Sequence, residues 1–363
     1  MNSLFTAYPA LRGALPCVDI AEVPTPVDPL ESFRAESGAE SIHVKRDDLT
    51  SPVYGGNKVR KLSLLLGAAR ARGARSVITF GGAGSNHALA TALFAAPLGM
   101  RCRSILGPQH NAHSVRRNLL AALNAGAILC PSAWRDTARE TRRCFLAAAD
   151  EDGVFPSVIP PGGSSPLGAV GFVDAAFELR DQVLAGIVQE PHYIYVASGT
   201  MGTCVGLALG LVAAGLSTRV EAVRVTTDPY TGMAHARALF QTCNRLLREA
   251  DPTFPEYPFP EDRFRIREEF FGGEYALHTE ASVDAVRRAK AVGVHLEGTY
   301  TGKTFAALLH DAAAGTLRGK RILFWNTHNS RDTAALGAGA DWHDLPPALQ
   351  RYFEEPVQPL DRA

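Results

Sequence analysis

Predicted strands alternate with predicted helices along most of this chain, and no other feature limits its fold more. The apolar segments expected to form strands are 40–44, 76–80, 101–106, 127–130, 192–196, 220–226 and 321–325. Helical spacing of apolar residues predicts helices at 58–72, 88–98, 111–126, 134–149, 169–188, 204–214, 282–291 and 302–314. Because strands joined through a helix lie parallel, the pattern predicts an α/β fold with parallel or mostly parallel sheets flanked by helices.

The composition excludes several classes of function. With 363 residues, 46% of them hydrophobic, the chain is long enough for two domains with ample core. Lys plus Arg and Asp plus Glu number 37 each, so the zero formal charge gives no electrostatic basis for binding nucleic acid or a membrane surface. No apolar run approaches the roughly 20 residues of a membrane span, and we identify no secretory signal. We therefore expect a cytoplasmic protein.

The cysteines are scattered and form no Cys-x-x-Cys pair. They are Cys17, Cys102, Cys130, Cys144, Cys204 and Cys243. In a chain of this size, such spacing is typical of reduced, mostly buried thiols rather than of a zinc site or a disulfide framework. We therefore expect no metal site.

A Gly-Gly-Asn-Lys run, residues 55–58, follows a polar stretch and precedes a predicted helix. The glycine pair permits a tight turn, and Asn57 is a good N-cap, so Lys58 is expected near a helix N-terminus. The positive potential there opposes protonation and lowers the pKa of an amine. Such a lysine suits Schiff-base chemistry with a carbonyl cofactor, although an ordinary solvated lysine beside a loop is the alternative.

Two further strand-to-helix turns carry small polar residues. Ser198-Gly199-Thr200-Met201-Gly202-Thr203 offers backbone amides and hydroxyls to a single phosphate group, unless its glycines serve only packing. Ser85-Asn86-His87 offers a hydroxyl, a carboxamide and a helix start, which suit a substrate carboxylate. N-capping by Ser85 or Asn86 is the alternative for the second turn.

The segment from Lys45 to Lys61, together with these turns, resembles the D-cysteine desulfhydrase and 1-aminocyclopropane-1-carboxylate deaminase family. These are fold-type II pyridoxal-phosphate enzymes of the tryptophan synthase β-subunit type. Two later segments also resemble the family, at Gly273-Glu274-Tyr275 and at Leu296–Lys303 with its Tyr300-Thr301 pair. The resemblance extends from about Thr25 to His328 and implies pyridoxal 5'-phosphate as the cofactor.

The resemblance also implies roles for individual residues. It makes Lys58 the residue that holds the cofactor aldehyde, and Asn86 a contact of the ring oxygen. The cofactor-binding residues it implies are Asn57, Lys58, Asn86, Gly199, Thr200, Met201, Gly202, Thr203 and Thr301. The substrate-binding residues are Ser85, Asn86 and His87, and the catalytic residues are Lys58, Ser85, Tyr275 and Tyr300.

Three single residues and one turn depart from the family pattern. Gly84 and Leu89 replace a glutamine and an arginine beside Ser-Asn-His, and Met201 stands where a small residue is usual. The last strand leads into residues 326–329, Asn-Thr-His-Asn, instead of His-Thr-Gly-Gly. Thr301, where the cyclopropane deaminases carry glutamate, would place a hydroxyl opposite the pyridine nitrogen and leave that nitrogen neutral.

The resulting expectation is a two-domain fold-type II enzyme with the cofactor in the interdomain cleft. Residues 1–60 and 172–363 would form the large domain, and 61–171 a smaller inserted α/β domain. The expected reaction is α,β-elimination from a small amino acid such as D-cysteine, giving an α-keto acid and ammonia. Cyclopropane ring opening, β-replacement and a regulatory protein that binds pyridoxal phosphate with little turnover are the alternatives. A homodimer is expected by analogy with the family.

Overall fold

The structure is a computed structural model that describes residues 3–362. The chain forms two compact units. The first unit contains residues 3–15, 21–61 and 164–330, and the second contains residues 16–20, 62–163 and 331–362.

The first unit is built on a six-stranded sheet in the order β1-β2-β10-β7-β8-β9. The strands are β1 (Val27–Pro29), β2 (Ser41–Lys45), β7 (Tyr193–Ser198), β8 (Arg219–Arg224), β9 (Phe264–Arg267) and β10 (Arg321–Trp325). Only β1 runs antiparallel to its neighbour among these strands. The register places Phe324 beside Val44 and Tyr195, so the middle of this sheet is a packed apolar layer.

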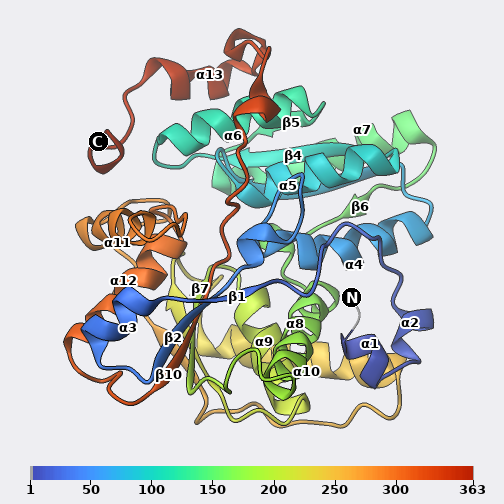
Figure 1. Cartoon of the computed structure of the whole chain (residues 1–363). Helices are drawn as coiled ribbons and strands as arrows, with labels where there is room; N and C mark the ends of the chain where they lie inside the picture. Colours follow the sequence, from blue (N-terminus) through green and yellow to red (C-terminus); the bar gives the residue numbers. More distant parts are fainter. Residues whose placement is uncertain (1–2, 363) are drawn as a thin grey trace. The chain divides into compact units, whose positions relative to one another are not determined.

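Helices cover both faces of this sheet (Figure 1). Helices α3 (Glu31–Ser37), α11 (Glu280–Lys290) and α12 (Thr301–Ala313) pack on one face, where Phe33 and Phe305 join the strand residues in one core. Helices α8 (Pro166–Leu184), α9 (Gly202–Ala213) and α10 (Met233–Ala250) lie on the other side of the strands in Figure 1. The short helices α1 (Ser3–Ala7) and α2 (Leu11–Ala14) belong to this unit, and α4 (Lys58–Ala71) begins in it.

The second unit is built on a four-stranded parallel sheet in the order β5-β4-β3-β6. Its strands are β3 (Ser76–Gly82), β4 (Arg101–Gly107), β5 (Ile128–Pro131) and β6 (Ser157–Val158). Its helices include α5 (Asn86–Ala95), α6 (His113–Asn124), α7 (Thr137–Asp152) and α13 (Pro347–Glu354). The prediction of two mostly parallel sheets flanked by helices is confirmed.

The C-terminal segment packs in the second unit, whereas the sequence expectation placed it with the large domain. Tyr352 explains this placement, because its hydroxyl accepts a hydrogen bond from the backbone N of Gln109 at 3.0 Å. The side chain of Asn111 in turn donates to the backbone oxygens of Tyr352 and Glu355, both at 2.9 Å. Strands β1, β6 and β9 and helices α1, α2, α3, α10 and α13 were not predicted from the sequence.

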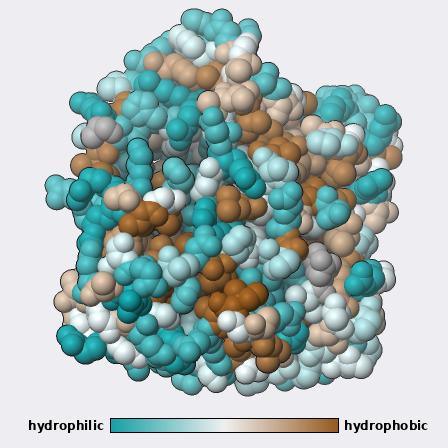
Figure 2. All heavy atoms as spheres, viewed as in Figure 1, coloured by the Kyte–Doolittle hydropathy of each residue, from teal (hydrophilic) through white to brown (hydrophobic). Residues whose placement is uncertain are grey.

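The surface has no dominant character on the face shown in Figure 2, where hydrophilic and hydrophobic residues are interspersed. Large apolar side chains that are exposed include Phe155 and Leu184. Within residues 3–362, no helix combines the length and the apolar character needed to cross a membrane.

Candidate active site

The glycine pair before Lys58 is required by close contacts of the backbone. A Cβ atom on Gly55 would lie 1.9 Å from the backbone oxygen of Asp48. Gly56 has a φ of +96°, and its N donates to the backbone oxygen of Asp47 at 2.8 Å. The loop is therefore folded back on Asp47 and Asp48, and Lys58 becomes the first residue of α4.

The unusual turn at 326–329 supports this loop. The side-chain oxygen of Asn329 accepts from the backbone N of Gly55 at 2.6 Å. The backbone oxygen of Thr327 accepts from the N of Asn57 at 3.2 Å. The Asn-Thr-His-Asn departure from the family pattern thus holds the lysine loop in place.

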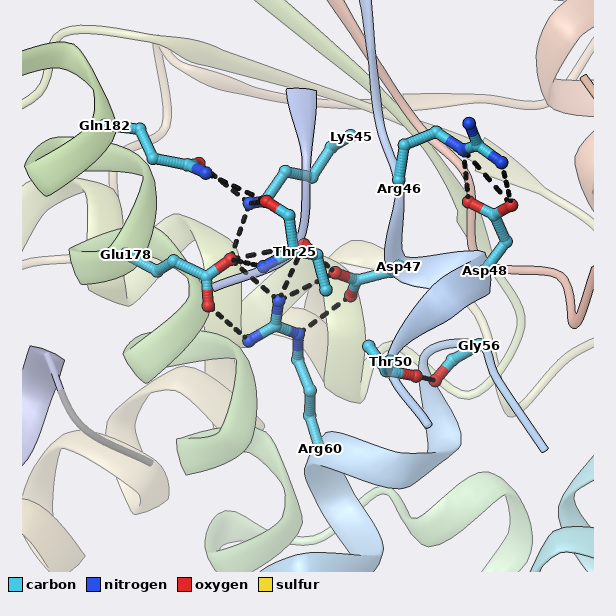
Figure 3. A network of polar contacts seen from close by, with 10 residues as sticks. All are labelled: Thr25, Lys45, Arg46, Asp47, Asp48, Thr50, Gly56, Arg60, Glu178 and Gln182. Atoms are coloured by element: carbon cyan, nitrogen blue, oxygen red, sulfur yellow. Dashed lines mark hydrogen bonds and ion pairs between the residues drawn. The ribbon is translucent and has the colours of Figure 1, made fainter. Parts of the chain in front are cut away.

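A buried network of charged side chains also holds the start of α4 in place (Figure 3). Arg60 donates to both oxygens of Asp47, at 2.7 and 2.9 Å, and to Glu178 of α8 at 3.0 Å. Lys45 of β2 donates to the same Glu178 at 2.5 Å. Burial raises the pKa of Glu178, but the charges of Arg60 and Lys45 outweigh it and lower that pKa to about 2. The network ties the first turn of α4 to β2 and α8.

Lys58 and Lys61 are two amines in the first turn of α4 with lowered pKa values. Burial is the largest cause for Lys58, and it lowers the pKa to about 8 against the opposing charges of Cys204 and Glu297. Burial and the charge of Lys58 lower the pKa of Lys61 well below its usual value. The lowered pKa expected for Lys58 is therefore present, but desolvation is its main cause, where the sequence argument named the helix N-terminus.

The loop between β7 and α9 forms a set of donors around Ser164. The hydroxyl oxygens of Ser164 and Thr200 are 2.7 Å apart. Ser164 also accepts from the backbone N of Gly202 at 3.1 Å and from Nζ of Lys61 at 3.2 Å. These groups gather hydroxyls, a backbone amide and an amine at the N-terminus of a twelve-residue helix.

These donors fit a phosphate group. A Cβ atom on Gly202 would lie 2.5 Å from Oγ of Ser164 and 3.0 Å from Nζ of Lys61, so the absence of a side chain keeps the cradle open. Asn57 adds a link to the loop, because its side-chain amide donates to the hydroxyl of Thr203 at 2.9 Å. A helix N-terminus and a buried amine both favour a bound anion.

Met201 adopts the left-handed conformation just before α9, with a φ of 65°. Its side chain is buried, and its sulfur accepts from the hydroxyl of Ser198 at 2.9 Å. Met201 therefore contributes the shape of the turn, and its side chain packs inside the unit.

Tyr275 and Tyr300 form a pair in the first unit, with hydroxyl oxygens 2.6 Å apart. Burial raises the pKa of both phenols. Both are therefore protonated at neutral pH, and the hydrogen-bonded pair can act as a proton donor.

Glu297 caps the start of α12. Its carboxylate accepts from the backbone N of Thr299, Tyr300 and Thr301 at 2.8–2.9 Å. The hydroxyl of Thr301 accepts from the backbone N of Glu297 at 3.0 Å and lies 3.3 Å from its carboxylate. Thr301 is fully buried, and its hydroxyl is used within this turn.

The Ser-Asn-His turn lies in the second unit. Ser85 is the N-cap of α5, and its hydroxyl accepts from the backbone N of Ala88 at 3.2 Å. The side-chain oxygen of Asn86 accepts from the amide of Asn118 at 2.9 Å. His87 is buried. The capping alternative is thus observed for Ser85, which retains further acceptor and donor capacity for a ligand.

The environment of positions 84 and 89 explains why glycine and leucine occupy them. A Cβ atom on Gly84 would lie 2.8 Å from Val115, which leaves no room for the glutamine of the family pattern. The backbone N of Gly84 instead donates to the side-chain oxygen of Gln109 at 2.9 Å. Leu89 is buried in the core of its unit.

The predicted residues therefore fall into separate groups. One group in the first unit joins Asn57, the lysines and the loop at 199–203, and the tyrosine pair and Thr301 lie in that unit too. Ser85, Asn86 and His87 belong to the second unit. Sequence reasoning missed Lys61, Ser164 and Glu297. The one local signal was the position of Lys61, one helical turn after Lys58.

Comparison with known proteins identifies the family. The model of the family "Pyridoxal-phosphate dependent enzyme" matches residues 18–328. The chain belongs to this family. The cofactor of this pyridoxal-phosphate dependent enzyme is therefore the one that the resemblance implied, and the donors around Ser164 suit its phosphate.

Individual relatives are similar over nearly the whole chain. The nocardicin C-9' epimerase of Nocardia uniformis subsp. tsuyamanensis is 35% identical, covering 94% of this chain and 100% of the relative. A D-cysteine desulfhydrase of Yersinia pestis is 30% identical, and the match covers 81% of this chain and 87% of the relative. A crystal structure of an ACC deaminase homologue has a TM-score of 0.75 at 30% identity, and the match covers 93% of this chain and 98% of the homologue. The resemblance to the desulfhydrase and deaminase family is confirmed.

Proposed function

We propose that this pyridoxal-phosphate dependent enzyme is a lyase that eliminates a leaving group from the β-carbon of a small amino acid, with D-cysteine as the leading substrate. The observation that carries the proposal is the partly buried Lys58, in which desolvation lowers the pKa of the amine to about 8. An amine with this pKa is partly neutral near pH 7.5 and can act as a base, whereas an ordinary lysine is almost entirely protonated there.

The bound cofactor supplies the electron sink that makes the α-proton of an amino acid acidic. Lys58 holds the aldehyde before substrate arrives, and its freed amine then takes the α-proton. The β-substituent leaves with the electrons of its bond to carbon, and hydrolysis of the unsaturated amine gives the α-keto acid and ammonia. Tyr275 and Tyr300, protonated at neutral pH, supply the proton that the leaving group needs.

Binding roles follow the same proposal. The 199–203 loop, with Lys61 and Ser164, holds the phosphate, while Asn57 fixes Thr203 at 2.9 Å. Ser85 and His87 bind the substrate carboxylate, and Asn86 contacts the cofactor ring oxygen. Thr301 presents no carboxylate to the pyridine nitrogen, which suits expulsion of a good leaving group. A homodimer in the cytoplasm completes the proposal by analogy with the family.

Epimerisation at the α-carbon is a second candidate, favoured by the 35% identity to nocardicin C-9' epimerase. Both reactions begin with removal of the α-proton by Lys58. They differ in the next step, because an epimerase returns a proton to the opposite face of the same carbon. The hydrogen-bonded phenols of Tyr275 and Tyr300 offer a donor for that proton.

One experiment separates the two reactions. The holoenzyme is incubated in deuterated water with D- and L-cysteine, with D- and L-3-chloroalanine, and with D- and L-alanine, which lacks a leaving group. Elimination predicts keto-acid release from the cysteine or chloroalanine substrates. Epimerisation predicts α-deuterium and inversion in alanine with no keto acid. Lys58→Ala is the control and should abolish both reactions. No keto acid from any of the substrates would contradict the proposed lyase, and the absence of both reactions would contradict both candidates.

A further inference from the structure

Cys130 and Cys144 form a pair of buried thiols in the second unit. Cys130 lies in β5 and Cys144 in α7, and both pack against Ile78 and Ile105. The thiol of Cys144 donates to the sulfur of Cys130 at 3.3 Å. Because a disulfide bond is about 2.0 Å long, the sulfurs would need to approach by only about 1.3 Å to bond.

The surroundings of Cys130 favour its thiolate. The hydrogen bond from Cys144 is the largest cause of its lowered pKa, and the charges of Arg143 and Arg103 act in the same direction against burial and Glu140. Cys102, in the neighbouring strand, lacks such cations among its influences, and burial raises its pKa to about 12. A thiol donor beside a second sulfur whose pKa is lowered is the arrangement of a resolving and an attacking cysteine.

An ion pair on α7 lies beside the sulfur of Cys144. Arg143 donates to both oxygens of Glu140 at 3.0 Å, and one of these oxygens lies 3.7 Å from the sulfur of Cys144. The side chain of Arg143 is 62% exposed and that of Glu140 is 17% exposed. A small polar oxidant can reach the pair by displacing this ion pair.

We propose that Cys130 and Cys144 are a redox modification site that hydrogen peroxide converts reversibly to a disulfide. The thiolate of Cys130 attacks one peroxide oxygen; an S–O bond forms, the O–O bond breaks, and hydroxide leaves and takes a proton to give water. The sulfur of Cys144, losing its proton, then attacks the sulfenic sulfur; the S–S bond forms, and the S–O bond breaks to release a second water. Both sulfurs are oxidised and the peroxide is reduced, and an added dithiol reverses the change.

The test is peptide mapping of holoenzyme treated with hydrogen peroxide, in a Cys17→Ser background that removes the exposed thiol. The expected product is one cross-linked peptide pair containing Cys130 and Cys144, with a mass lower by about 2 Da, that dithiothreitol restores. In Cys144→Ser, dimedone should label Cys130, which loses its resolving partner. Cys102→Ser is the matched control, a buried thiol in the adjacent strand, and should leave the cross-link unchanged.

Several results would overturn the proposal. Recovery of both peptides as free thiols after peroxide treatment is one, and a disulfide involving any other cysteine is another. Because Glu140 and the two sulfurs lie within 4.8 Å of one another, zinc added alone is tested in parallel. If both thiols bind zinc and peroxide leaves both thiols reduced, the pair is a metal site and not a redox pair.

Discussion

At the scale of single residues, the defining feature is a pair of lysines, Lys58 partly buried and Lys61 fully buried. Lys58 and Lys61 lie one helical turn apart, and burial is the largest cause of the lowered pKa of each. Keeping a proton on such amines destabilises the folded protein, and a phosphate anion held by the loop at 199–203 would offset this cost. Groups with strongly shifted pKa values are concentrated at functional sites.

The first prediction concerns Lys58→Met in the apoenzyme. The pKa of Lys58 is about 8 in the folded protein, against an ordinary lysine value of 10.5. Below about pH 8 the lysine is protonated in both states, so its burial penalty is fully present, and stability rises as pH increases toward 10.5 because the unfolded chain then binds more protons. The shift corresponds to about 3 kcal/mol.

Urea unfolding of the two apoproteins measures this effect. Lys58→Met should be more stable than the unmodified chain by up to about 3 kcal/mol at pH 7, and the difference should shrink as the pH rises from 8 to 10.5. Lys290→Met, at an exposed lysine, is the control and should show no such trend. A difference for Lys58→Met that does not vary with pH would contradict the assignment of a lowered pKa.

At the scale of elements, the site depends on how helices begin. Helix α9 begins at Gly202 beside Ser164, α12 begins under the carboxylate of Glu297, and α5 begins at the N-cap Ser85. Each start leaves backbone N–H groups that need an acceptor. Glu297 and Ser85 accept from these groups in α12 and α5. At the start of α9 the backbone N of Gly202 donates to Ser164, and the further donors around Ser164 suit an anion.

The second prediction is that Gly202→Ala weakens cofactor binding. The added methyl group would lie 2.5 Å from Oγ of Ser164 and 3.0 Å from Nζ of Lys61. Losing two hydrogen bonds to a charged phosphate costs about 3 kcal/mol or more, so the dissociation constant should rise at least about a hundredfold. Titration of the apoenzyme with pyridoxal phosphate, followed by the cofactor's absorbance, measures it.

Gly13→Ala is the matched control, because a Cβ atom at Gly13 meets nothing within 4 Å. It should bind the cofactor like the unmodified enzyme. Unchanged binding in Gly202→Ala would show that the loop serves packing alone.

At the scale of the whole molecule, residues 331–362 return to the second unit and support its turn at 84–87. Tyr352 binds the backbone of Gln109, and the side chain of Gln109 accepts from the N of Gly84. Asn118 donates to the backbone oxygen of Gly84 at 2.8 Å and to Asn86. The C-terminal segment thus positions the residues that we propose to bind the substrate.

The third prediction is that Tyr352→Phe raises the KM of the amino-acid substrate. Loss of the hydroxyl leaves the N–H of Gln109 without its acceptor, which costs about 1–3 kcal/mol. Because the side chain of Gln109 accepts from the N of Gly84, we expect the turn at 84–87 to be held less firmly. We expect KM to rise about tenfold with kcat reduced less than threefold, while the cofactor's absorbance is unchanged.

Steady-state kinetics of Tyr352→Phe and of Tyr230→Phe, at a tyrosine 41% exposed, provide the comparison. The control should match the unmodified enzyme. Equal losses of kcat and cofactor content in Tyr352→Phe would mean a general loss of folding and would contradict a positioning role.

The sequence by itself determined the features that are local in the chain. Alternating periodicities predicted the mostly parallel sheets, since side chains repeat every two residues in a strand and about every 3.6 in a helix. The glycines before Lys58 predicted a tight turn, and the order of the motifs predicted the family and its cofactor. These inferences succeeded because each depends on contiguous residues.

Only the tertiary structure decided the partners of those residues. Lys61 meets Ser164 across 103 positions, Asn57 meets Thr203 across 146, and Gly55 meets Asn329 across 274. A hydrogen bond requires atoms about 3 Å apart, and the path of the chain through both sheets sets which atoms come that close. The pairing of Cys130 with Cys144 has the same origin, since no local pattern predicts that β5 and α7 bring these two sulfurs together.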